Sequence, residues 1–358
     1  MERVQIAFFG RTNSGKSTLV NAICGQQVSL VSDVPGTTTD PVRKLVELPY
    51  GIGPAVLVDT AGYGDEGELG AQRERLTRQV IDGTDVAVLL RTGHPADDRW
   101  ERLLRDAGVP VVFPGPDRES ILKSIAEALP PREKRFLTGR LVQKGSRVLL
   151  VMPQDSEAPE GRIILPQVQV IRELLDRGCT AVCCTPESLH GSLKALGSAP
   201  DLVITDSQVF TEVDRAIPRE TPLTSFSVLL AGAKGDARVL VEGAAAIDRL
   251  KPGDRVLIAE ACSHVPASED IGRVKIPALL MKKMAGQAGG LKVDIAAGND
   301  FPEDLRPYSL IIHCGACVAT GTLVMSRIKK ALRAGVPITN YGIALAKLKG
   351  IIDRISIP

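Results

Sequence analysis

The sequence predicts an α/β protein built from three domains. Apolar strand-like runs alternate with amphipathic helix-like runs along most of the chain, and a glycine-rich loop separates the first strand from the first helix. A proline-rich and charged segment, LPPREKR at 129–135, interrupts this alternation. The chain has 358 residues, more than one hydrophobic core usually holds. We therefore expect domains at 1–133, 138–220 and 221–358.

The first domain should hold a mostly parallel sheet with intervening helices. A helix is predicted over Lys16–Cys24, directly after the glycine-rich loop. Strands are predicted at Val4–Phe9, Lys44–Leu48, Ala55–Asp59, Val86–Leu90 and Val109–Phe113.

The middle domain repeats the same strand–helix alternation on a smaller scale. It begins near Arg147 with RVLLV, continues through a helix over Gln167–Asp176, and adds the strands TAVCC and DLVITD. A core this small often depends on oligomerisation. Because its strands are short and apolar, an exposed edge can pair with a second copy, and we expect a homodimer.

The third domain begins near Pro222 and is again α/β. Its strands are expected in RVLIAEAC, LKVDIAAG, SLIIHCGAC and VPITNYG, with a helix that runs to about Ala334. In open α/β sheets, ligands bind outside the carboxyl ends of the strands. Polar residues at those ends are therefore the candidates for chemistry.

Composition excludes several functions. The net charge is only +2 and aromatic residues make up 3%, so neither a basic nucleic-acid surface nor a stacking platform for bases is expected. No apolar run is long enough to span a membrane. The first residues already form a strand and carry no signal-peptide pattern, which predicts a cytoplasmic protein. In that reducing compartment, clustered cysteines indicate metal binding or catalysis before disulfides.

Residues 10–17, GRTNSGKS, form a phosphate-binding loop in the required strand–loop–helix context. Lys16 should contact the β- and γ-phosphates, and the Ser17 hydroxyl should contact Mg²⁺. Asp59 ends the strand of VDTAG and suits a second magnesium contact. Thr38, in the segment GTTTD at 36–40, is the candidate for a γ-phosphate-sensing magnesium ligand, although such a segment can also be an ordinary turn. The full set expected around the nucleotide is Asn13, Ser14, Gly15, Lys16, Ser17, Thr18, Thr38, Asp59, Gly62 and Asp117, with Lys16, Thr38 and Asp59 as the catalytic residues.

These motifs resemble the translation-factor-like GTPases, and most closely the tRNA-modification branch with its GxxNxGKS and GTTxD patterns. The resemblance implies GTP and Mg²⁺ as ligands, and it implies potassium-assisted hydrolysis through Asn13. Asparagine is also a common turn residue, so Asn13 has a purely local explanation as well. Position 63 is Tyr, where Ras-type enzymes place a water-orienting Gln.

The guanine-reading motif departs from this pattern. GTPases carry Asn-Lys-x-Asp after the fifth strand, and the matching stretch here is VVFPGPD. Asp117 stands in register, whereas Pro114 and Gly115 occupy the Asn and Lys positions. No second base-contact loop is evident after it. Guanine selectivity is therefore expected to be weakened.

Two further motifs follow strands of the third domain. Cys262 and His264 form C-x-H, and His313, Cys314 and Cys317 form H-C-x-x-C. If the two strands are neighbours, these residues meet at one metal site. The set fits a closed zinc site or an iron–sulfur cluster, and the residue types do not decide between them. The remaining cysteines and histidines are expected to be structural or superficial: Cys24, Cys179, Cys183, Cys184, His94 and His190.

Taken together, the three modules resemble the FeFe-hydrogenase maturation GTPase family over essentially the whole chain. The resemblance implies that Cys262, Cys314 and Cys317 hold a 4Fe–4S cluster, with His264, His313 or Glu260 as candidates for the fourth iron. It implies a scaffold that receives a diiron precursor made with two radical-SAM enzymes and transfers it to apo FeFe-hydrogenase. Two alternatives stay open: a zinc-stabilised, NTP-dependent regulator and a tRNA-modification GTPase.

Overall fold

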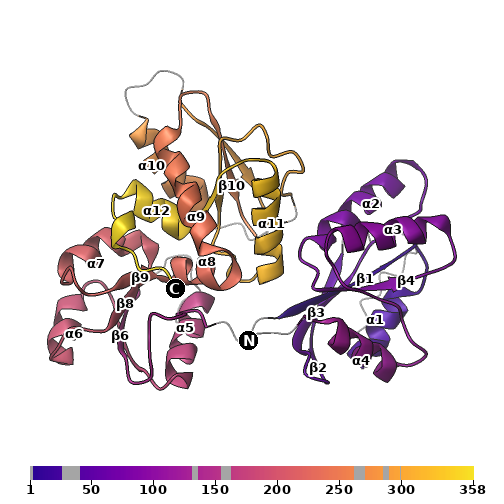
Figure 1. Ribbon diagram of the computed structural model, residues 1–358, viewed down its shortest axis with the longest axis horizontal. Coiled ribbons are helices and arrows are strands. Elements are labelled where there is room, and N and C mark those ends of the chain that lie inside the picture. The colour runs from indigo at the N-terminus through magenta and orange to yellow at the C-terminus, as the bar shows by residue number, and fades with distance from the viewer. Residues whose placement is uncertain are drawn as a thin grey trace. The chain divides into compact units, whose positions relative to one another are not determined.

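The computed structural model describes residues 3–25, 41–130, 136–154, 163–261, 271–284, 290–298 and 300–358. The chain divides into two compact units, Met1–Glu133 and Lys134–Pro358 (Figure 1). Both units are α/β, which confirms the predicted fold class. None of the described helices is both long and apolar enough to span a lipid bilayer.

In the first unit, the described strands form a five-stranded sheet in the order β2-β3-β1-β4-β5. Strand β2 is antiparallel to β3, and the other neighbours are parallel. The strands are β1 Val4–Gly10, β2 Val42–Leu48, β3 Gly53–Asp59, β4 Val86–Leu90 and β5 Val111–Val112. The helices are α1 Lys16–Cys24, α2 Gly67–Ile81, α3 Pro95–Asp106 and α4 Arg118–Ala128.

Helices cover both faces of this sheet. The side chains of β1 alternate, so that Ile6 and Phe8 pack with α1 and α4, whereas Ala7 and Phe9 pack with α2 and α3 (Figure 1). This period-two burial on both faces explains why β1 is apolar from Ile6 to Phe9. The arrangement places the loop after β1 at the carboxyl edge of the sheet, where α1 begins.

Helix α1 has the predicted bounds, but β5 is much shorter than predicted. The expected strand Val109–Phe113 is reduced to Val111–Val112. Pro110 and Pro114 flank it, and proline has no N–H to donate to a ladder. Phe113 therefore lies beyond the strand, in the loop that leads to α4.

The second unit contains two parallel four-stranded sheets among its described residues, in the orders β7-β6-β8-β9 and β11-β10-β12-β13. The strands are β6 Arg147–Val151, β7 Thr180–Cys184, β8 Leu202–Thr205, β9 Leu223–Ser225, β10 Arg255–Ala259, β11 Lys292–Ala296, β12 Leu310–His313 and β13 Ile338–Asn340. The helices are α5 Leu165–Asp176, α6 Leu189–Leu196, α7 Phe210–Ala216, α8 Phe226–Lys234, α9 Ala237–Ala244, α10 Ile276–Lys283, α11 Gly321–Arg333 and α12 Tyr341–Leu348.

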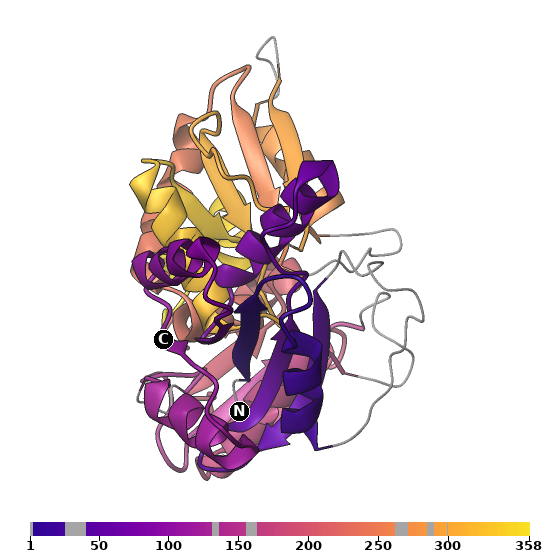
Figure 2. The same ribbon diagram turned by 90° about the vertical axis from the view of Figure 1, so that its right-hand side faces the viewer.

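The two sheets of this unit share one core. Leu149 and Val203 of the middle sheet belong to the same buried cluster as Leu257 and Ile311 of the last sheet. Figure 1 labels α8 next to β9 of the middle sheet and α9 of the last module, and Figure 2 shows the pink and orange parts of this unit from the side. Consequently the middle and last modules form a single compact unit.

The predicted boundary between 220 and 221 falls inside the middle sheet. Strand β9 pairs in parallel with β8, with Val203 opposite Leu223 and Thr205 opposite Ser225. The chain also returns to this sheet at its far end, where the Ser356 N–H donates to the Leu223 carbonyl at 2.7 Å. The sequence of a short apolar segment such as β9 does not indicate which sheet the segment joins.

Candidate functional site

The loop between β1 and α1 has the backbone conformation of a phosphate cradle. Asn13 has φ +61° and Gly15 has φ +90°, both in the left-handed region. Gly15 precedes α1, and no side chain caps this helix end. The N–H groups of the first turn, at Lys16, Ser17 and Thr18, therefore have no intrahelical acceptor and can bind an anion.

Lys16 is folded back over this loop. Its Nζ donates to the Gly10 carbonyl at 3.1 Å and to the Arg11 carbonyl at 2.7 Å. Burial lowers the pKa of Lys16, and the charges of Asp59 and Asp65 offset this lowering in part. Because the buried Lys16 ammonium is poorly hydrated, its electrostatic attraction to a phosphate oxygen is strong.

Ser17 and Asp59 meet beside Lys16 and fit a magnesium ion. The Ser17 Oγ donates to Asp59 Oδ2 at 2.5 Å, while Asp59 Oδ1 is buried with no hydrogen-bond partner among the described residues. Burial raises the pKa of Asp59, against the opposing effects of the Ser17 hydrogen bond and of the Lys16 and Lys44 charges. An unsatisfied carboxylate oxygen beside a hydroxyl is a donor set suited to Mg²⁺. The predicted ligand Thr38 lies outside the described residues.

Gly62 closes the cradle from the side of β3. Its φ is +97°, and an added Cβ would lie 2.9 Å from Lys16 Nζ and 3.0 Å from the Thr12 nitrogen. A side chain at position 62 would therefore displace Lys16. The Ser14 Oγ is buried near Gly10 without a partner among the described residues, whereas Asn13 and Thr18 are exposed.

Tyr63 points away from the cradle, so it does not orient water there. It is 1% exposed, and its ring stacks on Trp100 with 4.8 Å between centroids. Its hydroxyl donates to Asp97 Oδ1 at 3.0 Å. Burial, followed by the bond to Asp97, raises the pKa of Tyr63 far above its usual value.

Sequence analysis missed a contact between the cradle and the segment after β3. The Thr12 hydroxyl donates to Asp65 Oδ2 at 2.8 Å, and Arg73 pairs with the same oxygen at 2.6 Å. Asp65 and Arg73 belong to no recognisable motif, so no sequence signal indicates this contact. It couples the phosphate loop to the start of α2.

Asp117, the expected guanine acceptor, is the N-cap of α4. Its Oδ1 accepts from the Ser120 N–H at 2.8 Å, and the Ser120 Oγ closes the capping box through the Asp117 backbone. The bond from the Ser120 backbone, ahead of the other contacts, lowers the pKa of this carboxyl. The structure thus gives Asp117 a local structural role at the place where base recognition was predicted.

The two cysteine motifs of the second unit follow neighbouring strands. Strands β10 and β12 pair in parallel with Ala259 opposite His313, and the Cys314 N–H donates to the Ala259 carbonyl at 2.9 Å. The Ala261 N–H points at Cys314 Sγ, 3.1 Å away. Ala261 directly precedes Cys262. Cys262 and His264 themselves lie outside the described residues.

His313 and Glu260, two candidates for a fourth ligand, already have partners. The His313 Nδ1 lies 2.8 Å from the Cys314 carbonyl, which only accepts, so this nitrogen carries the proton. Arg327 donates to Nε2 at 3.1 Å. Burial, then the Arg327 charge, lowers the pKa of His313 to about 4. Both carboxylate oxygens of Glu260 pair with Arg273, at 3.0 and 2.7 Å.

Lys234 and Ala316 shape the loop that carries Cys314 and Cys317. Lys234 reaches from the end of α8 and donates to the carbonyls of Ala316, Cys317 and Ala319 at 2.7, 3.0 and 2.9 Å. Ala316 has φ +51°, which a residue other than glycine adopts at a cost of about 1 kcal/mol. Sequence patterns reveal neither feature, because the lysine is far from the motif in the chain.

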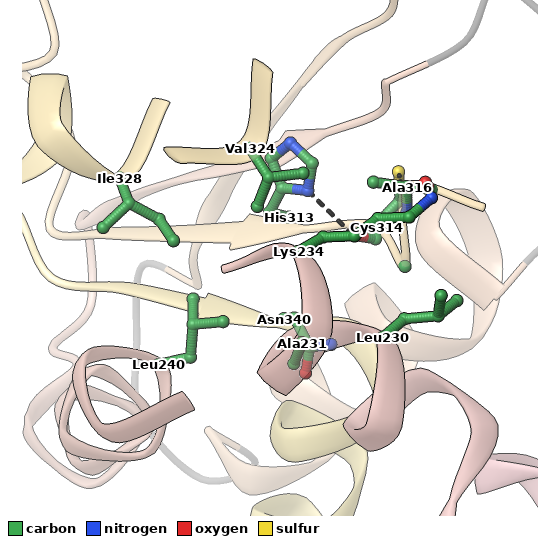
Figure 3. Close-up of a pocket in the computed structure, with 11 residues that line it drawn as sticks. Leu230, Ala231, Lys234, Leu240, His313, Cys314, Ala316, Val324, Ile328 and Asn340 are labelled. Atoms are coloured by element: carbon green, nitrogen blue, oxygen red, sulfur yellow. Dashed lines mark hydrogen bonds between the residues drawn. The ribbon is translucent and has the colours of Figure 1, made fainter. Parts of the chain in front are cut away.

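A small cavity of about 10 Å³ lies behind this loop, close to the smallest volume that holds one water molecule. In Figure 3, Lys234, His313 and Cys314 gather on one side of it, with Leu230, Val324 and Ile328 as apolar walls. Cys314 and Cys317 themselves are partly exposed, and the Lys234 ammonium lies against their loop.

The described residues fit part of a thiolate-held metal centre. Cys314 Sγ accepts hydrogen bonds from the N–H groups of Ala261 and Ala316, and the Lys234 ammonium of α8 contacts the same loop. Such donors stabilise a thiolate, and they influence the reduction potential of a cluster bound to it. Within the described ranges, no three His, Cys, Asp or Glu side chains group together to hold a metal. The structure therefore describes two of the three predicted thiolate ligands, Cys314 and Cys317. The third, Cys262, lies outside the described residues.

The other described cysteines and histidines contribute neither to the phosphate cradle nor to the cysteine loop. Cys179 and Cys184 are buried, as the packed-strand interpretation requires, but Cys183 is exposed because β7 is an outer strand. His94 caps α3 by accepting the Ala96 N–H, and His190 is exposed.

Comparisons with known proteins place the chain among hydrogen maturases and GTPases. Residues 238–358 match the model of the hydrogen maturase F tetramerization domain, and residues 137–235 match that of the hydrogen maturase F dimerization domain. Residues 5–113 match the 50S ribosome-binding GTPase model.

Individual relatives share only part of the chain. GTPase Era of Xanthomonas axonopodis pv. citri is 40% identical over 117 residues, which are 30% of this chain and 37% of Era. GTPase Der of Clostridium acetobutylicum is 37% identical over 108 residues, 29% of this chain and 24% of Der. An Era variant of Aquifex aeolicus bound to GDP.AlF4- aligns at 16% identity, with a TM-score of 0.28 and coverage of 86% of this chain and 99% of the other. The chain therefore spans less than two fifths of the length of the two sequence relatives.

Proposed function

Because the chain belongs to the hydrogen maturase F family, we propose that it is a GTP-hydrolysing scaffold that carries an iron–sulfur cluster during assembly of the FeFe-hydrogenase active site. The observation that carries this proposal is the contact of Ala261 with Cys314 Sγ. It brings the start of the Cys262 segment to the second cysteine motif, at the carboxyl ends of two neighbouring strands.

In the nucleotide site, the first-turn amides of α1 and the Lys16 ammonium bind the phosphates of GTP. Magnesium, when bound, neutralises charge on the β- and γ-phosphates. Ser17 and Asp59 supply its protein oxygens, and Lys16 exchanges the carbonyls of Gly10 and Arg11 for phosphate oxygens. Thr38 remains the proposed switch residue that senses the γ-phosphate, and Asn13 the proposed potassium ligand.

In the metal site, Cys262, Cys314 and Cys317 hold a 4Fe–4S cluster. A cube held by three thiolates leaves one iron for an exchangeable ligand. His313 and Glu260 are held by Arg327 and Arg273, so they are poor choices for that iron, and His264 or the cargo itself takes the position. The cations around the loop favour an anionic thiolate centre over a neutral one.

The cargo is a diiron precursor, and the proposed partners are two radical-SAM enzymes and apo FeFe-hydrogenase. An open iron lets such a fragment attach through a bridging ligand and leave again, which a closed four-thiolate site does not allow. Switch segments that order around the γ-phosphate then bias partner exchange. The matches to dimerization and tetramerization domains support a homo-oligomer, and the middle module is the proposed dimer contact.

The test is anaerobic reconstitution with iron and sulfide, followed by metal analysis and paramagnetic resonance. We expect about four irons per chain for one cube. Cys314→Ser should lose most of this iron, whereas the matched variant Cys183→Ser should keep it, because Cys183 is exposed on β7 far along the chain from the motifs. Unchanged iron in Cys314→Ser would refute the ligand assignment.

Zinc remains the competing centre, since thiolates of this kind also bind it. A colourless protein with one tightly held zinc and no iron uptake favours the zinc-stabilised regulator. The tRNA-modification alternative is supported by the GTPase match alone, and a strong, salt-sensitive affinity for tRNA is its test.

A further inference from the structure

The order of the strands indicates where the base of a bound nucleotide lies. The proposed magnesium ligand Asp59 ends β3 on one side of β1, and the phosphate loop follows β1 itself. The nucleoside therefore extends to the other side, over the carboxyl ends of β4 and β5. The loops at these ends are 91–94 and 113–117.

Selection of guanine over adenine needs particular hydrogen bonds. Guanine offers donors at N1 and N2 and an acceptor at O6, whereas adenine reverses this pattern at its six-position. A site whose buried groups pair with these atoms rejects the wrong base by about 10⁴-fold or more, and a site without them does not.

The acceptor that could read guanine is committed elsewhere. Asp117 caps α4 through the Ser120 N–H, and its side chain is solvent-exposed, so water competes for its remaining lone pairs. The loop 113–117 also packs closely against α4, because an added Cβ at Gly115 would lie 2.5 Å from the Ser120 Oγ.

Several positions of these loops cannot donate to the guanine O6, because they lack an N–H group or already use it. Pro114 and Pro116 have no N–H. At the end of β4, the Thr92 and His94 N–H groups both donate to Asp97 Oδ2, at 2.7 and 3.2 Å. After α4, the described part of this unit ends at Pro130 without a further loop at the sheet edge.

The base end also carries an aromatic and a guanidinium plane, which can stack on any base. Phe113 is 42% exposed, and the guanidinium of Arg91 lies 5.9 Å from its ring centroid. Aromatic and guanidinium planes stack on bases with little selectivity, because every base has a π-face.

We propose that this site selects the triphosphate and not the base, and that the protein hydrolyses ATP as well as GTP. The inference rests on the proposed nucleotide hydrolysis and names its substrate class. In the reaction, water bonds to the γ-phosphorus, the bond to the β–γ bridging oxygen breaks, and ADP, phosphate and a proton are released. Lys16, Ser17 and Asp59 serve both nucleotides, since they contact phosphate and magnesium only.

The experiment compares the full-length protein with the β,γ-imido analogues of GTP and ATP by calorimetry in the presence of Mg²⁺. Phosphate release from ATP and GTP is measured in parallel, with Lys16→Ala as the inactive control. We expect a preference for the GTP analogue of less than about 100-fold, the range reached without hydrogen-bonded readout. A larger preference overturns the inference while leaving GTP hydrolysis intact. Failure to bind either analogue contradicts the proposed nucleotide hydrolysis itself.

Asp117→Asn supplies the second measurement. Asparagine is as good an N-cap as aspartate, so the variant should fold. If Asp117 read guanine, the amide would disfavour GTP and favour XTP, since xanthine carries an oxygen where guanine carries its amino group. We expect GTP, ATP and XTP to keep their wild-type order in Asp117→Asn. A switch of preference to XTP overturns the inference.

Discussion

Asp97 illustrates how one buried carboxylate organises the core beneath the nucleotide site. It is fully buried and accepts the Thr92 N–H, the His94 N–H and the Tyr63 hydroxyl. Through Tyr63 it also positions Trp100, which is the only tryptophan of the chain. Fluorescence of Trp100 therefore reports on the first unit alone.

Asp97→Asn should destabilise the first unit by about 1–3 kcal/mol, because an amide group faces donors that need a second acceptor oxygen. Urea unfolding followed by Trp100 fluorescence measures the change. Asp98→Asn is the matched control, since that side chain is exposed and its ion pair with Arg91 lies at the surface. Equal stability of the two variants would contradict the assigned role.

The same carboxylate predicts a pH dependence. Burial alone would raise the pKa of Asp97, but the hydrogen bonds led by the Thr92 N–H outweigh it and hold the pKa below its usual value. A lowered folded pKa contributes stability that is complete above the unfolded value of about 3.9 and is lost as the pH falls through the folded value. The stability difference between wild type and Asp97→Asn should thus be constant from pH 7 to about pH 5 and shrink below about pH 4. A difference that stays constant down to pH 3 would rule out this linkage.

At the scale of elements, Lys234 joins α8 to the loop after β12. Its three carbonyl acceptors belong to the loop that carries Cys314 and Cys317. The helix lies in the part of the chain that matches the dimerization model, and the loop in the part that matches the tetramerization model. This contact transmits any displacement of α8 directly to the cysteines.

Lys234→Met should therefore weaken metal retention. The change leaves three carbonyls without their cation, at a cost of about 1–3 kcal/mol, and frees the strained Ala316 turn to relax. We expect iron release to a chelator to be several-fold faster than in wild type. Lys194→Met, on the exposed surface of α6, is the control, and equal release rates in both variants would exclude a positioning role.

The outer strand β7 makes a separate prediction about assembly. It lies at the edge of the middle sheet, and Cys183 is exposed on it. If the homodimer forms by pairing of β7 with its copy, two Cys183 thiols come close to the two-fold axis. A short bis-maleimide should then cross-link wild type into dimers but not Cys183→Ser. A dimer in solution that is not cross-linked would place the contact elsewhere.

At the scale of the whole molecule, the shared core makes the second unit one cooperative body. Buried side chains of both sheets belong to one cluster, which includes Leu149, Phe210, Leu257 and Ile338. A fragment of residues 136–358 should therefore unfold in a single calorimetric transition. Two separated transitions would show that the sheets fold independently.

Sequence analysis was most successful where the signal is contiguous. Helix α1 has its predicted bounds, and the predicted strand–loop–helix order around GRTNSGKS is present. The failures involve segments whose role depends on distant partners. Strand β9 joins a sheet that its three residues do not specify, and β5 is cut short by its flanking prolines.

The sequence by itself determined the α/β class, the triphosphate cradle and the two cysteine motifs, because each depends on residues adjacent in the chain and on the period of the backbone. Only the tertiary structure decided that Tyr63 is a core residue, that Asp117 caps a helix, and that His313 is held between Cys314 and Arg327. The physical reason is that a polar side chain takes whichever of its possible partners the folded backbone brings within hydrogen-bond distance, whether that partner is near in the chain, as Ser120 is to Asp117, or distant, as Asp97 is to Tyr63.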